Sequence, residues 1–137
     1  MASVSATEVL TPSVLVRLSA DGLWNRSSSS FYRFWSAEAS ALAYWSLDEA
    51  RWLRARVARN WVRFSDREVG ERFTTDQPLR RDGQWRLVVD GEWAIMSVVT
   101  LTASAEIIRN RTNDPRELFD FLNYTQGIYA AGLSVTY

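Results

Sequence analysis

Alternating apolar and polar residues near the N-terminus predict a β-hairpin. Residues 14–19 alternate between the two kinds of side chain, and Asp21-Gly22 follows them. This dipeptide is favoured in tight hairpin turns because glycine accepts positive φ. The aromatic run 31–35 comes after a polar stretch and is rich in strand-forming residues. We therefore predict a hairpin over residues 12–36, with the serines of 27–30 at its tip or bend.

Residues 46–64 fit two periodicities. As a helix, 46–49 form a capping box, and apolar residues recur at spacings of three and four at Ala50, Leu53, Val57, Trp61 and Phe64. As a strand, Leu53, Ala55 and Val57 share one face, whereas Arg54, Arg56, Ala58 and Asn60 share the other. The segment by itself leaves both alternatives open.

Two further strands are predicted in the second half of the chain. Residues 84–89 alternate, with Trp85, Leu87 and Val89 on one face. Asp90-Gly91 is a second candidate for a two-residue turn. Residues 93–103 form a long run of high β-propensity. Together these segments predict a sheet over residues 46–104.

A helical region is predicted at residues 114–131. Asp114 is a candidate N-cap, Pro115 stands at the first helical position, and Glu117 completes a reciprocal cap. The following apolar residues suit an amphipathic helix, with Gly127 and Gly132 as stops and 133–137 as an extended tail.

The composition argues against catalysis. The chain has 137 residues, 47% of them hydrophobic, which suits a single domain. Its sixteen basic residues are all arginine, and it contains no histidine or cysteine. A thiolate, a Schiff base, an imidazole relay and an ordinary zinc site are therefore excluded. The carboxylate pairs Asp48/Glu49 and Asp114/Glu117 are expected at helix starts. We predict no enzyme, no metal and no cofactor, and the N-terminus has no signal-peptide pattern.

The positive charge is concentrated in the middle of the chain. Residues 51–86 hold ten arginines and five acids, whereas 1–50 hold three and five and 87–137 hold three and six. A basic middle between acidic flanks can form a cationic surface for nucleic acid. The alternative is a solvated face with local ion pairs. The seven tryptophans are more than a single helix can cover, which favours a partner subunit that completes the core.

The chain resembles the coat proteins of single-stranded RNA bacteriophages. Residues 15–22 and 31–34 resemble their N-terminal hairpin, 47–49 and 53–60 their central basic strand, and 98–103 with 114–129 their last strand and covering helices. The resemblance implies an α+β fold, in which an N-terminal hairpin and an antiparallel sheet are covered by C-terminal helices. It also implies an interlocked homodimer.

The function implied by this resemblance is that of a capsid protein. Such a protein dimerises, assembles into an icosahedral shell and binds genomic RNA, including an operator hairpin, on its inner face. Its place would be the virion after synthesis in the host cytoplasm, with no membrane partner. The expected RNA-binding residues are Arg54, Arg56, Asn60, Gln84, Arg86, Thr100 and Thr102. The expected dimer interface comprises Trp85, Trp93, Leu118, Phe119, Phe121 and Leu122.

A second hypothesis follows from the helical alternative for 46–64. Helices followed by a curved sheet, with the motif at 82–87, resemble cone-shaped α+β domains of the nuclear-transport-factor-like and secretion-channel kinds. Such a domain would act as a ligand-binding or scaffold module.

Overall fold

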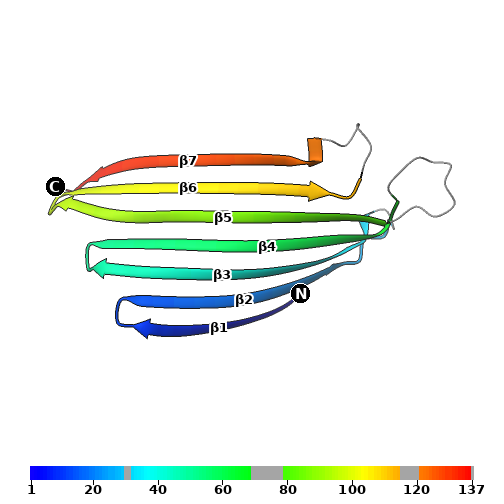
Figure 1. The fold of residues 1–137 in the computed structure, drawn as a ribbon, viewed down its shortest axis with the longest axis horizontal. Helices are drawn as coiled ribbons and strands as arrows, with labels where there is room; N and C mark the ends of the chain where they lie inside the picture. Colours follow the sequence, from blue (N-terminus) through cyan, green and yellow to red (C-terminus); the bar gives the residue numbers. More distant parts are fainter. Residues whose placement is uncertain (30–31, 69–78, 115–120, 137) are drawn as a thin grey trace.

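The chain forms one antiparallel sheet in the computed structural model, which describes residues 1–29, 32–68, 79–114 and 121–136 (Figure 1). The strands are β1 (Ala2–Thr11), β2 (Val14–Asn25), β3 (Phe34–Asp48), β4 (Arg51–Glu68), β5 (Leu79–Met96), β6 (Val99–Thr112) and β7 (Tyr124–Val135). Their order in the sheet is their order in the chain. Each strand therefore pairs only with its neighbours in sequence, and β1 and β7 are the two edges.

The two ends of the sheet differ in how the strands are connected. At the turn end, the connections are the short segments 12–13, 49–50 and 97–98. At the loop end, they are the longer segments 26–33, 69–78 and 113–123. Figure 1 shows the turn end at the left and the loop end at the right.

Polar side chains close the turn between β3 and β4. The Asp48 carboxylate accepts a hydrogen bond from the backbone N–H of Ala50 at 2.9 Å and another from Arg51 Nε at 2.6 Å. The bond from the Arg51 side chain, more than any other contact, holds the pKa of Asp48 below its ordinary value. The residues expected to cap a helix at 46–49 instead build a turn, because aspartate bonds nearby backbone N–H groups in either setting.

Both predicted two-residue turns are wrong. Asp21-Gly22 lies within β2 and Asp90-Gly91 within β5, where each glycine is paired with a neighbouring strand. Strands β2 and β3 do form a hairpin, but it runs from Val14 to Asp48 and so extends well beyond the predicted 12–36; residues 26–33 connect the strands, and the described serines 27–29 lie there. Pairing on both sides of each dipeptide outweighs its local preference for a turn.

The predicted α+β fold is wrong because 84% of the described residues are in strands, and no α-helix occurs among them. Residues 51–68 are strand β4, so the strand alternative for this segment holds and the helical one does not. Ile128 and Tyr129, expected in a covering helix, lie in β7. Residues 115–120 of the expected helix lie outside the described residues. Within the described residues, no helix is long and apolar enough to cross a membrane.

The sheet buries very few side chains. Among the described residues, the buried hydrophobic side chains are those of Ala58 and Ile108, which are 4% and 8% exposed, and the buried charged one is Asp114. A one-layer sheet leaves both faces uncovered, so most large apolar side chains are exposed. This arrangement is unlike the layered packing that gives most domains a core.

Candidate functional site

The two faces of the sheet have opposite character. Because directly paired residues point to the same side of a sheet, the register defines each face. One central row across β3 to β6 reads Ala41, Val57, Leu87 and Ile107, and the row beside it reads Ala43, Ala55, Val89 and Ala105. We call this side the apolar face. The other side carries most of the charged and hydroxyl side chains of these strands and is called the polar face.

Six of the seven tryptophans lie on the apolar face, in two belts. The loop-end belt comprises Trp24, Trp35, Trp61 and Trp85, and the turn-end belt comprises Trp45 and Trp93. All six are at least 43% exposed. Trp52 lies on the polar face, where its ring stacks on that of Tyr44 with centroids 5.9 Å apart. The apolar face is therefore an exposed surface with an aromatic border at each end.

The surface between the belts consists of small and aliphatic residues. Strand β3 shows the pattern most clearly, since alanine occupies the four alternate positions 37, 39, 41 and 43 between Trp35 and Trp45. Near the turn-end belt, a hollow of about 560 Å³ lies over Gly91, and its apolar lining includes Trp45, Leu53, Trp93 and Leu101. No charged side chain points from the apolar face within the central rows of β3 to β6.

Ion pairs between strands neutralise much of the polar face. The Arg54 guanidinium donates to both oxygens of Asp90, at 3.0 Å each. Arg56 donates to Glu38 at 2.8 Å. Arg86 donates to Glu106 at 3.0 Å. The alternative of a solvated charged face with local ion pairs, which the charge distribution left open, describes these three arginines.

The seven predicted RNA-binding residues all lie on the polar face. Arg54, Arg56 and Asn60 belong to β4, Gln84 and Arg86 to β5, and Thr100 and Thr102 to β6. The structure thus brings them to one side, as the strand alternative for 46–64 required. The Oδ1 atom of Asn60 is buried and has no hydrogen-bond partner within the described part of the chain.

The predicted dimer-interface residues do not form one surface among the described residues. Trp85 and Trp93 lie in the two different belts of the apolar face. Phe121 and Leu122 lie in a short 3₁₀ turn before β7, where Phe121 is 70% exposed. Leu118 and Phe119 lie outside the described residues.

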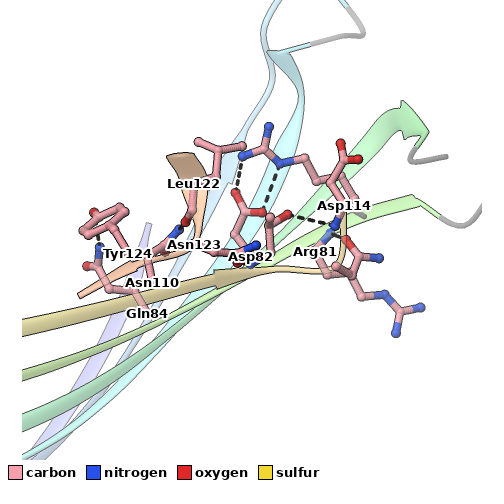
Figure 2. A network of polar contacts seen from close by, with 11 residues as sticks. Arg81, Asp82, Gln84, Asn110, Asp114, Leu122, Asn123 and Tyr124 are labelled. Atoms are coloured by element: carbon pink, nitrogen blue, oxygen red, sulfur yellow. Dashed lines mark hydrogen bonds and ion pairs between the residues drawn. The ribbon is translucent and has the colours of Figure 1, made fainter. Parts of the chain in front are cut away.

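A polar network holds the loop end of the sheet together (Figure 2). The guanidinium of Arg80 donates to both oxygens of Asp82, at 3.0 and 2.7 Å, and both side chains are less than one fifth exposed. Asn110 donates through Nδ2 to the Leu122 carbonyl at 2.6 Å, and the Asn123 side chain accepts from the Thr112 N–H at 2.9 Å. The bonds made by Asn110 and Asn123 fix the start of β7 against the end of β6.

Five arginines gather on the apolar face at the loop end. They are Arg59 and Arg63 of β4, Arg81 of β5, and Arg109 and Arg111 of β6. Charge counting along the chain did not separate them from the paired arginines of the polar face. Once the strands are known, the residue numbers show which face these arginines are on, because all five are odd-numbered, as are the central apolar residues of the same strands.

The described residues contain no group of acidic side chains suited to a metal ion. No protein family matches the sequence, and neither curated proteins nor solved structures include a similar one at a significant level.

Proposed function

We propose that this chain is a membrane-embedded sheet whose apolar face contacts lipid and whose polar face lines a water-filled space. The observation that carries this proposal is the exposed apolar face bordered by two belts of tryptophan. Tryptophan is enriched at both membrane–water interfaces, where its ring lies at the level of the headgroups. Transmembrane sheets likewise alternate between lipid-facing apolar and inward-facing polar residues.

The separation of the belts suits a bilayer. Trp85 and Trp93 are eight residues apart on β5, or about 26 Å at about 3.3 Å per residue. Trp35 and Trp45 are ten residues apart on β3, or about 33 Å along the strand. Transmembrane strands tilt by about 35–45°, so the β3 spacing spans roughly 23–27 Å along the membrane normal and matches an apolar band about 25 Å tall, whereas the β5 spacing spans roughly 19–22 Å and is a few Å shorter.

The register supports a tilt of the strands relative to the belts. At the loop end, Trp24 and Trp35 are paired and share one row of the apolar face. Trp61 lies one row closer to the turn end than this pair, and Trp85 lies two rows closer. At the turn end, Trp93 lies one row beyond Trp45, in the same direction. Both belts therefore step the same way across the sheet, as two parallel membrane surfaces require of tilted strands.

The polar face and the edges set further requirements. Ion pairs such as Arg54–Asp90 and Arg86–Glu106 are costly in hydrocarbon, so this face needs water. Unpaired sheet edges are not tolerated in lipid, so β1 and β7 need partner strands in the assembled protein. The expectation of no membrane partner came with the phage-coat resemblance, whereas alternation of apolar and polar residues along each strand is the pattern of a membrane-spanning sheet.

The phage-coat function is the second candidate, and one observation favours it. Its seven expected RNA contacts share the polar face, where single-stranded RNA would lie. Two features weigh against it. First, Arg54, Arg56 and Arg86 are already paired with acids, which reduces their attraction for phosphate. Second, residues 124–131, expected in a helix that covers the partner's sheet, belong to strand β7. The cone-domain alternative depended on a helix over 46–64, which is strand β4.

One experiment separates the two candidates. The chain is refolded in the presence of neutral phosphatidylcholine vesicles, and the mixture is floated on a density gradient. The membrane proposal expects the protein to float with the vesicles and to resist extraction by alkaline carbonate. The coat hypothesis expects uniform particles whose absorbance at 260 nm reveals RNA, and less RNA after Arg54 and Arg56 are both replaced by serine. Protein that stays at the bottom of the gradient, or that is stripped by carbonate, contradicts the membrane proposal.

A further inference from the structure

The five loop-end arginines and two tryptophans form one continuous patch across three strands. In its first row, Arg59 pairs with Trp85, which pairs with Arg109. In the second row, Trp61 pairs with Gly83, which pairs with Arg111. Arg63 and Arg81 pair in the third. We call this the arginine–tryptophan patch, consisting of Arg59, Trp61, Arg63, Arg81, Trp85, Arg109 and Arg111.

The positive charge of the patch has no acidic partner on the described residues. The ion pairs found there involve the arginines at 51, 54, 56, 80 and 86, and none of the five in the patch. None of the residues paired directly with the patch is an aspartate or glutamate, and the nearest acid by register on this face is Glu68, which pairs with Leu79 one row beyond Arg81. Five like charges on neighbouring strands repel one another, and an external anion would relieve that repulsion.

The residues around Arg59 hold its guanidinium in a position where it can bind an anion. Its guanidinium carbon lies 4.9 Å from the ring centroid of Trp85 and 5.7 Å from that of Trp61. Gly83 provides the space, because a Cβ atom there would lie 2.7 Å from Nη2 of Arg59. Within the described residues, no acceptor takes a hydrogen bond from this guanidinium. Its fork of donors is therefore held in place by the two rings and remains available to a phosphate group.

The position of the patch identifies the source of that phosphate. Arg59 and Arg109 lie level with Trp85 of the loop-end belt, and Arg63 and Arg81 lie beyond it, where lipid headgroups would be. The turn-end belt differs, since Arg51, the arginine beside Trp93, is already paired with Asp48. We propose that the arginine–tryptophan patch binds the phosphate groups of anionic phospholipids in the leaflet at the loop end. This inference rests on the proposed lipid contact of the apolar face.

The test compares vesicles of three compositions: phosphatidylcholine alone, phosphatidylcholine with phosphatidic acid, and phosphatidylcholine with an equal amount of charge carried by oleate. The variant Arg59→Gln with Arg109→Gln removes two charges from the patch. The control Arg17→Gln with Arg54→Gln removes two from the polar face. Wild-type protein and the control should prefer the phosphatidic acid vesicles over both others. The patch variant should lose about twenty-fivefold of that preference, because each of the two cations near an anionic surface contributes roughly fivefold.

Each other result overturns the proposal in a recognisable way. A patch variant that keeps the preference, or a control that loses it equally, excludes the patch as the site. Equal binding to oleate vesicles would show that the preference comes from negative charge in general and not from the phosphate group. Binding of inorganic phosphate by the detergent-solubilised protein, without any preference for phosphatidic acid vesicles, identifies a site for free phosphate. Wild-type protein that fails to enter phosphatidylcholine alone contradicts the proposed function itself, which separates that failure from failure of the patch. Strand content measured by circular dichroism in detergent verifies that each variant folds.

Discussion

The guanidinium of Arg59 lies over the backbone of Gly83, at a place where any side chain on residue 83 would collide with it. The atoms that would be displaced are the far end of a flexible side chain, so Gly83→Ala should leave the fold intact. It should move the guanidinium away from Trp85 and cost up to about 1 kcal/mol of cation–π contact. Tryptophan near-UV circular dichroism should change, and chemical unfolding should measure the small loss.

The matched control for this substitution is Gly22→Ala. Gly22 also lies on the apolar face, in β2, and the nearest atom to a Cβ there is the Ala2 carbonyl oxygen at 4.0 Å. We expect no change in the tryptophan signal from this variant. An equal change in both variants would show that the effect comes from the loss of glycine and not from Arg59.

A charge placed in the middle of the apolar face tests the lipid contact. Ala105 lies on this face midway between the levels of Trp85 and Trp93, and Ser104 lies beside it on the polar face. Ala105→Arg should weaken insertion into phosphatidylcholine vesicles by about 2–4 kcal/mol, the cost of arginine at the bilayer midplane. Ser104→Arg should have little effect, since residue 104 pairs with Asp90 on the hydrated side. Equal losses, measured by vesicle flotation, would contradict the assignment of the two faces.

The tryptophans on opposite faces should report different surroundings. Two variants are compared, one retaining only Trp93 and the other only Trp52, with the remaining tryptophans replaced by phenylalanine. Brominated acyl chains should quench Trp93, which points from the apolar face, and aqueous iodide should quench Trp52, which points from the polar face. The same pattern in both variants would argue against a sheet with one lipid-facing side.

The pair Arg54–Asp90 should be coupled and asymmetric. The Asp90 side chain is 14% exposed and that of Arg54 is 49% exposed. Arg54→Gln should therefore cost more than Asp90→Asn, because it leaves the less hydrated partner without its counter-charge. A double-mutant cycle should give a coupling of about 1 kcal/mol, reduced by the exposure of Arg54. No coupling would mean that the bidentate contact adds nothing to stability.

The strand segments were partly predictable because alternation is a local property. Residues 14–18 and 84–89 alternate and lie within β2 and β5, and Leu53, Ala55 and Val57 share a face as the strand alternative for β4 required. The same alternation placed the seven expected RNA contacts on one side of the sheet. The spacing of Trp35, the four alanines and Trp45 was equally visible, and it indicates a face bordered by aromatic residues.

The turns and the C-terminal region were not predictable in this way. Asp21-Gly22 and Asp90-Gly91 have the chemistry of turns, yet both lie within strands because neighbouring strands pair on either side of them. Ile128 and Tyr129 suit the apolar side of a helix, but pairing with β6 makes them part of a strand. These outcomes depend on hydrogen bonds between residues far apart in sequence, which a local pattern does not record.

The sequence by itself determined which side chains alternate, and hence that each strand has an apolar and a polar side. Only the tertiary structure decided that these sides align across seven strands. It also decided that Arg54, Arg56 and Arg86 lie on the polar face beside acids, whereas the five arginines of the arginine–tryptophan patch lie on the apolar face near Trp61 and Trp85. The physical reason is register. A shift of one residue in any pairing would move every side chain of a strand to the opposite face, and that choice is made between strands and not within them.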